Sequence, residues 1–174
     1  MDAVINAPAN LWSIAIHEAG HAVVGARLGL PVISIDIHDG SDGLDGVCKV
    51  DYSRARPAAW LTVVMAGSAA EETIVGFRMD SRPHLGSDQD EIAAALAKVS
   101  SSQRAVLMAT ATQQSRRMTT VHYGAIRGLA QVLLENAAMT GSAWDEVSIH
   151  IDGERLFEAL GGSDVAILRL AANG

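Results

Sequence analysis

The sequence contains a single cysteine, Cys48, so the chain cannot form an internal disulfide. A fold without disulfides does not require an oxidising compartment. No activating partner for this thiol can be identified in the sequence. We therefore interpret Cys48 as a small, half-buried strand residue and not as a catalytic nucleophile.

Basic clusters and long apolar runs are also missing. The formal net charge is -7, which argues against nucleic acid or an anionic membrane surface as the main partner. The longest uncharged, mostly apolar run covers 57–70 and is shorter than the roughly 20 residues that a membrane span needs. The first ten residues, MDAVINAPAN, lack the basic and apolar regions of a signal peptide. We therefore expect a cytoplasmic protein with no membrane span.

Hydrophobic residues make up 49% of the 174 positions, which predicts one globular domain over 1–174 with a sizeable core. Hydrophobic periodicity, caps and breakers predict the elements. We expect helices over 10–29 and 57–76. A third helical stretch, capped by Ser87, is expected from about 88 to 138, with a break at 100–102. Strands are predicted over 32–38, 47–52 and 149–151, and short terminal helices over 154–160 and 165–172. The predicted fold class is mainly α with a small antiparallel β element.

The strongest local signal is the HExxH pattern HEAGH, which begins at His17 and ends at His21. Residues four apart lie about one turn apart on nearly the same face of a helix, so both imidazoles can reach one ion. Glu18 points about 100° away, where a base can take a proton from metal-activated water. The pattern predicts a zinc site on His17 and His21 with Glu18 as the catalytic base of a peptidase.

Catalytic zinc usually has three protein ligands and one open position for water. The side chains that could supply the third ligand are Glu71, Glu72, Asp88, Asp90, His38, His84, His122 and His150. A carboxylate on another helix commonly completes an HExxH site, which favours the first four of these residues. Spacing alone does not choose among them.

Three segments, in this order, resemble the peptidase domain of the FtsH-type proteases, which are membrane-anchored, ATP-dependent zinc proteases. The segments are HEAGHAVVGARLG at 17–29, MAGSAAEETIVG at 65–76 and GSDQDEIAAA at 86–95. A weaker match is LAQVLLENAAMTG at 129–141. The resemblance implies a single zincin-like, FtsH-type peptidase domain with a core at about 10–147 and a C-terminal extension at 148–174.

The resemblance further implies that Asp90 is the third zinc ligand, with Asp88, two residues earlier, as the alternative. Glu71 or Glu72 would then accept a hydrogen bond from a ligand imidazole. An edge of the strand at 32–38 would line the cleft, where a substrate could add as an extended strand.

The implied function is that of a zinc metallo-endopeptidase acting on protein or peptide substrates. Two alternatives stay open. One is a catalytically silent zinc-binding module, and the other is a peptidase subunit that works with a separate AAA+ ATPase, with homo-oligomers possible in either case. The sequence contains no G-x-x-x-x-G-K-[ST] motif, so no P-loop for nucleotide is expected within it.

Overall fold

The computed structural model describes residues 9–40, 43–76, 85–139 and 148–152. The elements, in chain order, are α1 (Ala9–Arg27), β1 (Val32–Gly40), β2 (Gly43–Val50), α2 (Pro57–Val64), α3 (Ala66–Ile74), α4 (Leu85–Ala97), α5 (Ser101–Val121), α6 (Tyr123–Met139) and β3 (Ser148–Asp152). The predicted class, mainly α with a small antiparallel β element, is confirmed. The short terminal helices expected over 154–160 and 165–172 lie outside the described residues.

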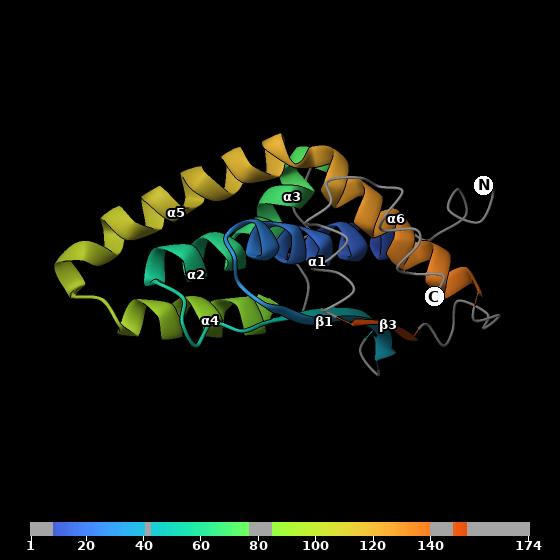
Figure 1. Ribbon diagram of the computed structural model, residues 1–174, viewed down its shortest axis with the longest axis horizontal. Helices are drawn as coiled ribbons and strands as arrows, with labels where there is room; N and C mark the ends of the chain where they lie inside the picture. The colour runs from blue at the N-terminus through green and yellow to red at the C-terminus, as the bar shows by residue number, and fades with distance from the viewer. Residues whose placement is uncertain (1–8, 41–42, 77–84, 140–147, 153–174) are drawn as a thin grey trace.

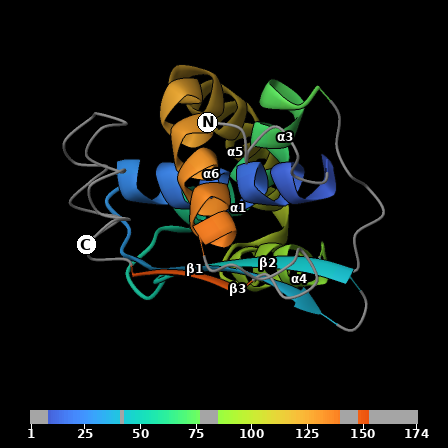
Figure 2. The ribbon, with the colours of Figure 1, turned by 90° about the vertical axis from the view of Figure 1, so that its right-hand side faces the viewer.

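Helix α1 runs through the middle of the molecule, with the sheet on one side and α3, α5 and α6 on the other (Figure 1). Figure 2 shows the same layers after a quarter turn. A helix that is covered on all sides is expected to be apolar around most of its circumference, and the sequence IAIHEAGHAVVGA fits this. One core cluster comes mainly from α1, β1 and α6 and includes Ile14, Val23, Ile35, Ile37, Leu129 and Leu133.

The three strands form one antiparallel sheet in the order β2-β1-β3. β1 pairs with β2 from Val32↔Val50 to Gly40↔Gly43, and with β3 from Ser34↔Asp152 to His38↔Ser148. β3 lies in the segment assigned from sequence to a C-terminal extension, and its backbone is part of the sheet. The expectation that the first strand offers a free edge to substrate is wrong, because β1 is the central strand. β2 is an edge strand of the described sheet.

Several of the predicted helix boundaries differ from those observed, and the helical stretch expected to run on to 138 has a further break at His122, between α5 and α6. The helix expected over 57–76 is divided at Met65 into α2 and α3. Pro57 lies in the first turn of α2, where its missing N–H costs nothing. α4 begins at Leu85, so Ser87 lies within the helix and does not cap it. Among the described helices, none has both the length and the apolar character needed to cross a bilayer.

Candidate metal centre

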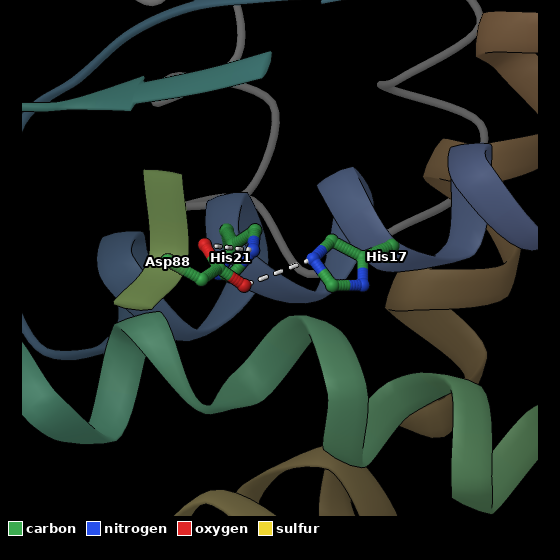
Figure 3. Close-up of side chains that lie close together, drawn as sticks. All are labelled: His17, His21 and Asp88. Atoms are coloured by element: carbon green, nitrogen blue, oxygen red, sulfur yellow. Dashed lines mark hydrogen bonds and ion pairs between the residues drawn. The ribbon is translucent and has the colours of Figure 1, made fainter. Parts of the chain in front are cut away.

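His17 and His21 lie one turn apart on α1 and are almost completely buried, with 7% and 6% of their surfaces exposed. Both rings turn their Nε2 atoms toward the carboxylate of Asp88 on α4 (Figure 3). His17 Nε2 lies 3.2 Å from Asp88 Oδ2, and His21 Nε2 lies 3.6 Å from Asp88 Oδ1. The three side chains form a group that could hold a metal ion.

The structure brings Asp88, and not Asp90, to the two histidines. Asp88 is half-buried in the first turn of α4, whereas Asp90 is exposed. Two residues along a helix correspond to a rotation of about 200°, so the two carboxylates face in nearly opposite directions. The preferred assignment of the third ligand to Asp90 is therefore corrected to Asp88, which was the alternative.

The other ring nitrogens are turned away from Asp88, toward α3 and the end of α2. His21 Nδ1–H donates a hydrogen bond of 2.8 Å to the carbonyl oxygen of Val63. His17 Nδ1 lies 3.4 Å from Oε2 of the buried Glu71. Metal-binding histidines usually have such a carbonyl or carboxylate partner, which fixes the tautomer and the ring orientation. The arrangement leaves Nε2 of each ring available as a metal ligand.

Gly67 on α3 borders the space between the two Nε2 atoms. A Cβ atom built on this glycine would lie only 2.5 Å from Nε2 of both His17 and His21. A side chain at this position would therefore collide with the two ligand atoms, so the close packing of α3 against them requires glycine. Two imidazole nitrogens and one carboxylate oxygen close together match the donor set of a three-ligand catalytic zinc site.

Glu18 lies on a different side of α1 from the two histidines, facing β2. Only 5% of its surface is exposed. A Cβ built on Gly46 of β2 would lie 2.7 Å from Glu18 Cγ and 2.8 Å from Glu18 Oε1. The backbone of the edge strand therefore passes directly over this carboxylate, in the position expected from the HExxH spacing.

The electrostatics of the group favour a charged His17. Burial lowers the pKa of His17, but its hydrogen bond to Asp88 and its contact with Glu71 outweigh this effect. Together with the charge of Glu18 they raise the pKa to about 10. Burial likewise opposes ionisation of Asp88, but the neighbouring His21 and His17 hold the pKa of this carboxyl below its usual value. A metal must therefore displace a proton from His17.

Contacts near Asp88 hold α4 against α2. Trp60 Nε1–H donates a 2.7 Å hydrogen bond to Glu91 Oε2, one turn after Asp88. Lys98 Nζ lies 4.4 Å from the centre of a Trp60 ring, at a cation–π distance. The Tyr52 ring stacks on Trp60, with 4.9 Å between the ring centres. These contacts fix the position of the helix that carries the third candidate ligand.

The other candidate ligands are not part of this group. Glu72 pairs with Arg116 of α5 at 3.2 Å, and His122 lies at the C-terminal end of α5. His84 and the side chains of His38 and His150 fall outside the described residues.

Sequence reasoning missed Gly67 and Val63, whose roles depend on how α2 and α3 pack against α1. The run of small residues in MAGSAAEE was the only available signal, since small side chains permit close helix packing.

Comparison of the chain with protein-family models and with curated proteins gives no match.

Proposed function

We propose that this protein is a zinc metallo-endopeptidase with a zincin-like fold, similar to the peptidase domain of the FtsH-type proteases. The observation that carries the proposal is the convergence of His17 Nε2, His21 Nε2 and the Asp88 carboxylate, with Glu18 on the adjacent side of the same helix. His17, His21 and Asp88 would hold the ion. A bound zinc would supply Lewis acidity and a water of lowered pKa.

Glu18 is the general base in this proposal. Its carboxylate accepts a proton from the attacking water and later returns it to the leaving amine. The side chain is nearly buried, and the hydrogen-bonding backbone of β2 is next to it. Its position beside the cluster favours the enzyme over a silent zinc-binding module.

An extended peptide is the substrate shape that suits this site. β2 is an edge strand of the described sheet, and at Gly46 it passes over Glu18. A peptide that adds to such an edge forms main-chain hydrogen bonds that do not depend on its sequence. We therefore propose protein or peptide chains as substrates. A separate AAA+ ATPase and homo-oligomers remain part of the proposal, as the FtsH resemblance implies.

Replacing Glu18 tests the proposal directly. Glu18→Gln keeps the shape of the side chain and removes the base, so hydrolysis of a denatured protein or a fluorogenic peptide library should fall at least about 100-fold. Zinc content, measured after dialysis, should be unchanged. Glu72→Gln is the matched control, because Glu72 pairs with Arg116 at the surface. Wild-type turnover by Glu18→Gln would refute the mechanism, and chelator-resistant turnover by the wild type would refute the metal dependence.

A further inference from the structure

Three polar side chains follow one another along a single face of α1. Ser13, His17 and His21 are spaced four residues apart, so each lies about one turn from the next. Ser13 is completely buried, with 0% of its surface exposed. A buried hydroxyl is costly without a hydrogen-bond partner, so the partner of the Ser13 hydroxyl matters for the two histidines next to it.

Ser13 contacts the carboxylate that faces His17. Its Oγ–H donates a 2.8 Å hydrogen bond to Glu71 Oε1, and the other oxygen, Oε2, lies 3.4 Å from His17 Nδ1. Glu71 is itself buried, with 3% of its surface exposed. The serine therefore fixes one oxygen of a buried carboxylate whose second oxygen faces the ligand ring.

The two ligand rings are held in different ways. His21 Nδ1 is fixed by a 2.8 Å hydrogen bond to a backbone carbonyl, that of Val63. His17 Nδ1 is buried and has no hydrogen-bond partner among the described residues, because its contact with Glu71 lacks hydrogen-bond geometry. On its Nδ1 side, one ring is thus held by the backbone, whereas the other faces the Glu71 side chain and is held by Asp88 at its opposite nitrogen.

We propose that Ser13 is a positioning residue for metal binding, which acts through Glu71 on His17. By holding Oε1, the serine hydroxyl keeps Oε2 next to His17 Nδ1, and so keeps His17 Nε2 turned toward Asp88 and close to Nε2 of His21. This inference rests on the metal binding in the proposed function. It does not depend on peptide hydrolysis.

The test measures zinc affinity by competition with a chromophoric chelator. Ser13→Ala should weaken zinc binding about 10-fold or more, as loss of outer-shell partners typically does. It should also change the visible absorption of the cobalt-substituted protein, which reports ligand geometry. Ser115→Ala is the matched control. Ser115 is equally buried, and its hydroxyl donates to the carbonyl oxygen of Thr112 in α5.

A double-mutant cycle tests whether Ser13 acts through Glu71. Glu71→Gln should itself weaken zinc binding, and adding Ser13→Ala to it should weaken binding no further. If Ser13→Ala does not fold, its effect is measured in the Glu71→Gln background, because the neutral amide removes the buried charge that loses a hydrogen-bond donor when the hydroxyl is deleted. Zinc binding by the double variant should then equal that of Glu71→Gln alone, and weaker binding would contradict the route through Glu71.

The outcomes separate this inference from the proposed function. Wild-type protein that takes up no zinc would refute both. Ser13→Ala is compared directly with Ser115→Ala. If the two variants have the same zinc affinity and the same cobalt spectrum, the role of Ser13 is refuted and the proposed peptidase is not affected. Additive losses in the cycle would overturn the route through Glu71.

Discussion

Replacing Gly67 by alanine should abolish tight metal binding with little effect on the metal-free fold. The new Cβ would lie 2.5 Å from Nε2 of both His17 and His21. Ordinary contact between these atoms requires roughly 3.5 Å, so each ring end must move by about 1 Å. Metal–ligand distances tolerate only about 0.2 Å. We therefore expect zinc affinity to fall at least about 100-fold, beyond the usual effect of an outer-shell change.

The metal-free protein should tolerate the same change better. The atoms that clash are the ends of two side chains, which can shift slightly together with their hydrogen-bond partners when no ion requires an exact geometry. Overpacking costs about 1–3 kcal/mol, and replacing a helical glycine by alanine returns about 1 kcal/mol. The free energy of unfolding in the presence of chelator should therefore change by no more than about 2 kcal/mol.

Chelator competition measures the zinc affinity, and urea unfolding measures the stability. Gly25→Ala on α1 is the control, because its Cβ would lie at ordinary distances of 3.6 Å from Val50 and Val63. If Gly67→Ala binds zinc as tightly as Gly25→Ala, the ion is not bound by the two Nε2 atoms next to Gly67, and the proposed metal site is refuted.

Two further predictions concern the ligands. Asp88→Asn should lower zinc affinity at least about tenfold, whereas Asp90→Asn should leave it unchanged. Zinc content after dialysis measures the difference, and loss of metal from Asp90→Asn alone would show that Asp90 is the third ligand. The pKa of His17 is raised to about 10 from an ordinary 6.5, so zinc must displace a proton from this ring at neutral pH. Chelator competition should therefore show a zinc affinity that rises about tenfold per pH unit from pH 7 to 9. A plateau above pH 7 would contradict this. In the metal-free protein the charged ring stabilises the fold fully below pH 6.5, and this stabilisation is lost as the pH rises through 10.

Local sequence patterns predicted the helix that carries the two histidines and the alternation of strands after it. They did not choose between Asp88 and Asp90, which are two residues apart, and the preference for Asp90 came from the resemblance. An assumed cap at Ser87 placed the start of the third helix at Asp88, whereas α4 begins at Leu85. Asp88 and Asp90 face in nearly opposite directions on such a helix, so only the packed structure distinguishes them.

Non-local pairing was the second source of error. The sequence predicts three strands, but it does not say on which side of β1 the last one adds. β3 occupies the second edge of β1, which moves the free edge of the described sheet to β2. Gly67 and Ser13 were missed for a related reason, because a small residue and a buried hydroxyl gain their roles only from the helix packed opposite them.

The separation of the ligands along the chain has a consequence for biosynthesis. His17 and Asp88 are 71 positions apart, and Asp88 reaches the histidines only once α4 has docked against α2 through Trp60 and Glu91. A nascent chain that exposes only α1 offers an ion two imidazoles and no third ligand. If the protein acts as proposed, tight metal capture is postponed until the later helices are in place, and with it the proposed hydrolytic activity toward neighbouring unfolded chains.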